Sequence, residues 1–294
     1  MNNNLKINSD QKINYKVLES VDGTILIKFK EGYSTVVIPT INNKTAVCVS
    51  SQIGCPLGCT FCHTKHFKRN LLAEEIINQV KIALTVVLDN HNSKTNFSSD
   101  INQINFPNSA PDRSLTSVIF MGMGEPMLNF EEVNKAINIF NKDFNLAFKK
   151  ITLSTIGLNL DKLISAKFNI AISLHSPLDE TRTKLIPKSN LSVEQIVNFT
   201  KQFSNKKSGV MISYALIKNI NDSKNDLLNL LSLDWPKNIN FNLLEFNETN
   251  KFKPSSKREI EFFKKEIIKA GFKCFIRQSR GKDIGAACGM LTLI

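Results

Sequence analysis

The sequence contains no apolar run as long as the ~18 residues that a helix needs to cross a bilayer. Its first residues, MNNNLKINSDQK, lack the apolar core of a secretory signal. Acidic residues are scarce, because 26 Asp and Glu stand against 38 Lys and Arg. These absences predict a cytoplasmic protein with no membrane partner, and the net charge of +12 favours a nucleic acid as partner. A genome rich in Lys, Asn and Ile codons would also produce this charge, so charge alone does not decide.

The six cysteines do not indicate a disulfide framework, because the sequence shows no export signal. Cys55, Cys59 and Cys62 form a C-x-x-x-C-x-x-C triplet. Three thiolates can hold three irons of a [4Fe–4S] cluster and leave the fourth iron open to a substrate. A zinc site completed by His63 or His66 is the alternative, although zinc sites usually pair two C-x-x-C units and the sequence has no second unit.

Short apolar runs alternate with helical patterns along most of the chain. β-rich runs at 15–18, 24–29 and 33–38 predict a small antiparallel sheet. Further strands are predicted at 46–50, 117–121, 151–155, 169–174, 210–217, 239–245 and 273–277. Helices are predicted at 73–88, 131–140, 160–166, 224–231 and 256–270, with one more after the capping box Ser192-x-x-Gln195.

About six strand–helix units predict an α/β fold with a mostly parallel sheet, in the form of a partial barrel. The predicted division is an N-terminal β extension over 1–45 and a core barrel over 46–294 that ends in a cysteine-bearing segment. Residues 91–115 are polar and rich in Asn and Ser, so they predict a disordered or mobile loop insertion. In such folds the chemistry belongs at the carboxyl ends of the strands.

The cysteine triplet resembles the signature of the radical S-adenosylmethionine (radical SAM) enzymes. Gly124 and Glu125, in the run Met121–Pro126, are similar to the turn that holds the SAM amino group in that superfamily. The resemblance implies a partial (βα)₆ barrel and a [4Fe–4S] cluster held by Cys55, Cys59 and Cys62. SAM would chelate the open iron and be cleaved to a 5′-deoxyadenosyl radical.

A narrower resemblance connects the chain with RNA adenosine methyltransferases of the RlmN/Cfr type, over roughly residues 15 to 294. The similar segments, in order, are 48–55, 121–126, 153–155, 171–175, 219–222 and 280–289. The resemblance implies that Cys288 is methylated by one SAM, gives up a hydrogen to a radical from a second SAM, and delivers the carbon to an adenine. The resulting protein–RNA crosslink would be resolved by Cys48, through a transient disulfide with Cys288.

The resemblance also implies SAM contacts at strand ends. These are Gly124, Glu125, Ser154, Ser173, Leu174, His175 and Asn247. It implies methylation at C2 of an adenosine in 23S rRNA, with an adenosine beside the tRNA anticodon as a further candidate, by a monomer that takes electrons from a flavodoxin or ferredoxin. Methylation at C8, as in the Cfr variant, shares every motif and stays open. A decayed, metal-bound RNA-binding protein is the other alternative.

Three departures from the family pattern motivate that alternative. The family usually carries a helical N-terminal domain that this sequence does not show, and the stretch after Cys62 is short. Ser34 stands where the family has a glutamate thought to remove the C2 proton. Serine is a poor general base at neutral pH, so another base, water or an RNA group would have to serve.

Basic residues that fall near predicted strand ends or near Cys288 are candidates for phosphate contacts. They are Lys65, Lys68, Arg69, Lys149, Lys150, Arg182, Lys184, Lys188, Arg277, Arg280 and Lys282. Cys274 lies in an alternating run outside all of these motifs and is predicted to be a core residue.

Overall fold

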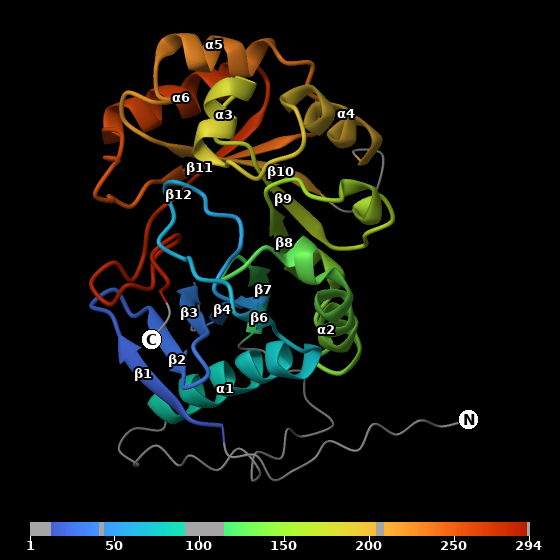
Figure 1. The fold of residues 1–294 in the computed structure, drawn as a ribbon, viewed down its shortest axis with the longest axis vertical. Coiled ribbons are helices and arrows are strands. Elements are labelled where there is room, and N and C mark those ends of the chain that lie inside the picture. The colour runs from blue at the N-terminus through green and yellow to red at the C-terminus, as the bar shows by residue number, and fades with distance from the viewer. Residues whose placement is uncertain (1–12, 41–43, 92–114, 204–208, 293–294) are drawn as a thin grey trace.

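The computed structural model describes residues 13–40, 44–91, 115–203 and 209–292. One long sheet organises this part of the chain (Figure 1), in the order β1-β2-β3-β4-β7-β8-β9-β10-β11-β12. Residues 92–114, which make up nearly all of the predicted loop insertion, lie outside the described residues.

Seven strands of this long sheet, from β4 to β12 in the order just given, are parallel, and each pairs with the next. They are β4 (Lys44–Cys48), β7 (Leu115–Phe120), β8 (Ile151–Thr155), β9 (Asn169–Ser173), β10 (Val210–Leu216), β11 (Asn240–Glu245) and β12 (Lys273–Arg277). The order is linear, with β1 and β12 at its two ends. The α/β partial barrel predicted from the alternation of strands and helices is confirmed.

Three antiparallel strands extend the same sheet beyond β4. They are β1 (Tyr15–Glu19), β2 (Ile25–Phe29) and β3 (Ser34–Thr40). Because β3 pairs directly with β4 in antiparallel fashion, the N-terminal strands continue the parallel sheet without a break. A separate two-stranded sheet, β5 (Gln52–Ile53) with β6 (Arg69–Asn70), closes the base of the loop that carries the cysteine triplet.

Helices lie around the outside of the sheet (Figure 1). They are α1 (Ala73–His91), α2 (Phe130–Lys142), α3 (Asp179–Leu185), α4 (Val193–Phe203), α5 (Lys224–Ser232) and α6 (Lys257–Lys269). Short 3₁₀ turns occur at η3 (Pro126–Asn129), η4 (Phe148–Lys150) and η5 (Leu160–Leu163). The helix predicted over 160–166 is therefore only the turn η5, and α3 was not predicted.

Apolar periodicity and caps explain these helices. α2 buries Val133, Ala136, Ile137 and Phe140, the spacing of one helix face. The predicted capping box at α4 is confirmed, because the Gln195 amide donates to Ser192 Oγ (3.2 Å) and the Ser192 amide donates to Gln195 Oε1 (2.9 Å).

Two apolar clusters support the strand ends. The large one fills the space between the sheet and its helices, and it includes the buried Cys274, as predicted. The small one consists of Leu57, Ile156, Leu185, Ile186, Ile217 and Phe246, with Cys55 and Cys59 packed against it. The cysteine-bearing loop thus rests on apolar side chains that follow several strands. Among the described helices, none has the length and apolarity needed to cross a membrane.

Candidate active site

A cavity of about 160 Å³ lies where the parallel strands end. It brings together residues predicted from distant parts of the sequence: Cys55, Cys59, Cys62, Gly124, Glu125, Ser154, Ser173, His175, Asn247 and Cys288. Leu174 does not line it, because its side chain is fully buried in the core behind the strand end. Ser154 and Ser173 lie in β8 and β9, as the rule for parallel sheets predicts.

Backbone hydrogen bonds hold the loop that carries the cysteine triplet. The Thr60 amide donates to the Leu185 carbonyl (3.0 Å), and the His63 amide donates to the Gly289 carbonyl (2.7 Å). Lys65 Nζ donates to the Cys59 carbonyl. The loop is thereby joined to α3 on one side and to the segment after Cys288 on the other.

The arrangement of the three cysteine side chains as possible metal ligands favours a [4Fe–4S] cluster over a single zinc ion. The three cysteines are half-buried and line one cavity. Nowhere in the described part of the chain are three His, Cys, Asp or Glu side chains grouped closely enough to hold one metal ion. A zinc site needs its ligands to converge on one point, whereas the thiolates of a [4Fe–4S] cluster each bind a different iron. The residues present therefore fit a cluster.

Glu125 presents a fixed carboxylate to the cavity. Its Oε1 accepts the Met127 amide (3.1 Å) and its Oε2 accepts the Ile156 amide (3.0 Å). Gly124, with φ +97, lies so close to Gln52 that a Cβ would come within 2.6 Å of the Gln52 Cβ. The Glu125 amide in turn donates to Gln52 Oε1 (2.9 Å). Burial raises the pKa of Glu125 to about 7, and a cationic ligand such as an ammonium would favour its charged form.

This pKa predicts how the stability of the protein without SAM varies with pH. The folded carboxyl binds its proton more tightly than the unfolded one, so its contribution is greatest below about pH 4.5 and is lost as the pH rises to about 7. Relative to Glu125→Gln, the wild type should lose on the order of 3 kcal/mol of unfolding free energy between pH 4.5 and 7.5. Urea unfolding of both proteins measures this; a difference that does not change with pH would contradict it.

The cavity also contains a polar atom without a protein partner. Ser213, in β10, is fully buried, lines the cavity, and its hydroxyl makes no hydrogen bond in the described structure. A buried hydroxyl without a partner costs free energy that a polar ligand can recover. This observation fits a bound cosubstrate with polar groups, as SAM has.

His175 is held rigidly beside the triplet loop. Its Nδ1 accepts the Ala215 amide (3.0 Å), so the neutral ring carries its proton on Nε2. Burial lowers the pKa of His175 to about 3. Asn221 Nδ2 donates to the carbonyls of His175 (2.6 Å) and Ala215 (2.8 Å). Asn221, within the family segment 219–222, therefore supports the histidine from behind.

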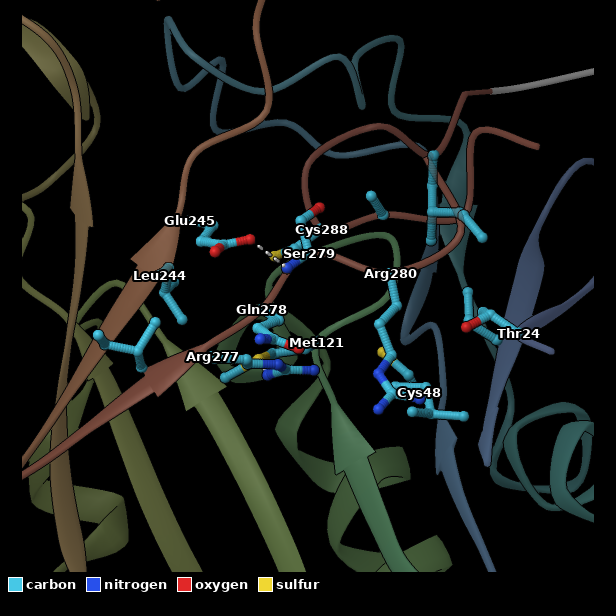
Figure 2. Close-up of a pocket in the computed structure, with 16 residues that line it drawn as sticks. Thr24, Cys48, Met121, Leu244, Glu245, Arg277, Gln278, Ser279, Arg280 and Cys288 are labelled. Carbon is cyan, nitrogen blue, oxygen red and sulfur yellow. Dashed lines mark hydrogen bonds between the residues drawn. The ribbon is translucent and has the colours of Figure 1, made fainter. Parts of the chain in front are cut away.

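A second cavity, of about 310 Å³, shares part of its lining with the first. Figure 2 shows the residues that line this second cavity. Its lining includes Cys48, Glu245, Arg277, Arg280 and Cys288. Cys48 is the buried last residue of β4, and Cys288 is exposed. Burial raises the pKa of the Cys48 thiol to about 11, while the charge of Arg277 acts in the opposite direction. Cys288 lines both cavities, whereas Cys48 lines only the second.

The segment that carries Cys288 is tied to the N-terminal strands and to β11. The Gly281 amide donates to Asp22 Oδ2 (2.9 Å), and Ser20 Oγ donates to Asp283 Oδ1 (2.6 Å). Asn247 Nδ2 donates to the Cys288 carbonyl (2.9 Å). Asn247 was predicted as a SAM contact; in this structure it lines the first cavity and also holds the Cys288 backbone.

Several predicted RNA contacts are corrected by the structure. Arg182 is 1% exposed, because its guanidinium donates to carbonyls inside the fold, so it cannot reach a phosphate. Lys149 and Lys150 precede β8, which places them at the opposite end of that strand from the cavities. Arg69 stays exposed and pairs with Glu75 (2.7 Å), which does not decide whether it contacts RNA. Arg277 and Arg280 do line the second cavity.

Sequence reasoning missed Ser213 and Glu245, which line these cavities, and assigned no role to Asn221. Ser213 lies within an apolar run and carries no motif. Asn221 could have been found, because it belongs to a family segment already noted in the sequence.

The chain is similar to known RNA methyltransferases. No family model matches the chain. The dual-specificity RNA methyltransferase RlmN of Buchnera aphidicola subsp. Schizaphis graminum is 35% identical over 302 residues, which cover 96% of this chain and 76% of that protein. The protein of the same name from Wigglesworthia glossinidia brevipalpis is 36% identical over 294 residues, which cover 93% and 71%.

Solved structures share the fold. A radical SAM methyltransferase from Sphaerobacter thermophilus superposes with a TM-score of 0.77 at 28% identity, covering 95% of this chain and 81% of that one. The structure of TYW1 with a lysine-pyruvate adduct bound superposes with a TM-score of 0.54 at 16% identity, covering 80% and 83%, which shows a shared fold alone.

Proposed function

The chain belongs to the RlmN family of dual-specificity RNA methyltransferases, and we propose that it methylates C2 of an adenosine in 23S rRNA through a carbon carried on Cys288. An adenosine beside the tRNA anticodon is the proposed second substrate. The position of Cys288, which lines both cavities, is the observation that best supports this proposal. A carbon carrier must meet the radical source and the target base in turn, and a residue between two cavities meets that requirement.

The first cavity is the proposed place of the cofactors. When bound there, a [4Fe–4S] cluster and SAM would supply the methyl group and the one-electron cleavage that starts radical chemistry. Cys55, Cys59 and Cys62 are the proposed iron ligands. The carboxylate of Glu125 would accept the ammonium of SAM, and the unpartnered hydroxyl of Ser213 offers a further polar contact. Asn247 keeps the backbone of Cys288 at the edge of this cavity.

The second cavity is the proposed place of the target adenine, which must leave its stack to enter. C2 of adenine is an electron-poor carbon between two nitrogens, so it does not attack a methyl cation equivalent, and a radical route is required. A thiol can accept a methyl group, hold a carbon radical beside sulfur, and leave by thiol exchange. Cys288 would do the first two, and Cys48, which lines the same cavity, would release it as a disulfide.

The proposed partners follow from this chemistry. RNA phosphates would meet the positive charges of Arg277 and Arg280 at the second cavity. A small electron-transfer protein of the flavodoxin or ferredoxin type would supply the electron. We propose that the protein works as a monomer in the cytoplasm.

The proposal is tested with protein reconstituted anaerobically with iron and sulfide. It is incubated with SAM, a reductant and a 23S rRNA fragment or tRNA, and the nucleosides are analysed by mass spectrometry against 2-methyladenosine and 8-methyladenosine standards. We expect 2-methyladenosine. A reaction that yields 8-methyladenosine would assign the C8 specificity instead. SAM cleavage with only unmodified adenosine would contradict methylation, and a colourless zinc protein that binds RNA would support the decayed binding protein.

A further inference from the structure

We propose that Glu245 is the general base that removes the hydrogen of the target ring carbon as a proton. This inference rests on the proposed function and assigns a residue that neither the motifs nor the family resemblance single out. The observation behind it is the position of the Glu245 carboxylate between the two cavities that Cys288 also joins.

The chemistry requires such a base. C2 of adenine carries one hydrogen, and a new bond from the methylene carbon on Cys288 turns that ring carbon tetrahedral. The adduct also carries the unpaired electron of the radical, which would pass to the oxidised iron–sulfur cluster that the proposed function supplies. The ring regains its aromaticity when that electron leaves and the C–H bond breaks heterolytically: the proton moves to a carboxylate oxygen and the electron pair of the bond stays in the purine. The released carbon needs one proton to become a methyl group, so the base can return to its charged form by passing a proton to that carbon or to water.

Glu245 has the required position. It is the last residue of β11, and it lines both cavities together with Met121, Leu244, Cys288 and Leu291. Its Oε2 accepts the Ser279 amide (3.1 Å), and Figure 2 shows its carboxylate directed toward Ser279 and Cys288. Within the described residues its other oxygen has no hydrogen bond. One carboxylate oxygen is thus held by the backbone, while the other is available to an adenine in the cavity.

Among the described residues that line the second cavity, no other side chain is suited to act as the general base. Glu245 is the only carboxylate among its lining residues. Arg277 and Arg280 have no lone pair to offer, and Cys48 is needed as the resolving thiol. Glu125, which lines only the first cavity, has both oxygens occupied by backbone amides.

Ser34 is also excluded as a replacement for the glutamate of the family pattern. It is 1% exposed and does not line either cavity. Its carbonyl accepts the hydroxyl of Ser50 (2.5 Å), which fixes this part of β3 against the end of β4. The role of general base, which Ser34 cannot fill, is therefore assigned to Glu245 at the end of β11.

The test compares Glu245→Gln with a matched control, Glu248→Gln. Glutamine keeps the shape of the side chain and an oxygen for the Ser279 amide, but it cannot take up the proton. Glu248 is exposed and lines neither cavity, so its substitution should leave product formation unchanged. With Glu245→Gln, we expect normal S-methylation of Cys288 and a covalent protein–RNA adduct that accumulates. Release of methyladenosine should slow at least ~100-fold, the usual contribution of a general base.

Three outcomes would overturn the assignment. Methyladenosine release at the wild-type rate would show that Glu245 is not the base. Loss of Cys288 S-methylation, seen by mass spectrometry of the protein, would show that Glu245 only positions the Cys288 segment. Glu245→Asp that is no more active than Glu245→Gln would also contradict proton transfer. A wild-type protein that methylates no adenosine would instead overturn the proposed function and this assignment with it.

Discussion

Cys48→Ala is expected to stall with RNA covalently attached through Cys288, whereas Cys288→Ala should give neither product nor adduct. In the proposed relay, Cys288 carries the carbon and Cys48 only releases it, so the two variants should differ. Without a thiol in the same cavity, the C–S bond of the adduct has no partner that can free Cys288 as a disulfide. Nuclease-trimmed samples of each variant, analysed on a denaturing gel and by mass spectrometry, measure the adduct.

Cys274→Ala is the matched control for this pair. Cys274 lies in β12, is buried in the large core cluster and lines neither cavity. Its substitution should cost some stability without changing the course of the reaction. Normal turnover of Cys48→Ala, or methyladenosine made by Cys288→Ala, would contradict the relay.

Arg182→Met should lower the unfolding free energy and weaken SAM binding together. The Arg182 guanidinium donates to the carbonyls of Ile156, Ser173 (3.4 Å) and Leu191 (3.1 Å). Ile156 and Ser173 both line the first cavity, which is the proposed place of the cofactors. Each buried carbonyl left without a donor costs about 1–3 kcal/mol, so for three carbonyls we expect a loss of at least about 3 kcal/mol of unfolding free energy.

Chemical denaturation and SAM titration of the reconstituted protein measure these two effects. Arg258→Met is the control, because Arg258 is exposed on α6 and lies outside both cavities. An Arg182→Met protein as stable as the wild type, with the same SAM affinity, would mean that the carbonyls do not depend on the guanidinium.

Arg182 also shows where sequence patterns mislead. The segment Asp179–Leu185 has almost no apolar residues, so neither the helix α3 nor the burial of its arginine could be predicted from periodicity. A charged residue after a strand suggested a phosphate contact. The structure buries it instead, since the carbonyls at two strand ends need donors that only tertiary packing brings together.

More of the residues that line the first cavity, which holds the cysteine triplet, could be predicted from the sequence than of those that line the second cavity. The triplet and the Gly124-Glu125 turn have fixed short spacings, and strands with clear apolar runs place them at one edge of the sheet. The second cavity forms between β4, β11 and the C-terminal segment. That segment is held in place by hydrogen bonds such as the one from the Gly281 amide to Asp22. No local pattern marks a contact between residues so far apart, and Glu245 has no motif around it.

The central claim is that the product methyl carbon passes through Cys288. SAM with a fully deuterated methyl group tests it directly in a single incubation with RNA. A relay removes one deuterium atom while the carbon is on Cys288, and the last hydrogen is added as a proton, so the account predicts methyladenosine with two deuterium atoms in its methyl group. Methyladenosine with all three deuterium atoms would show direct transfer from SAM and contradict the account.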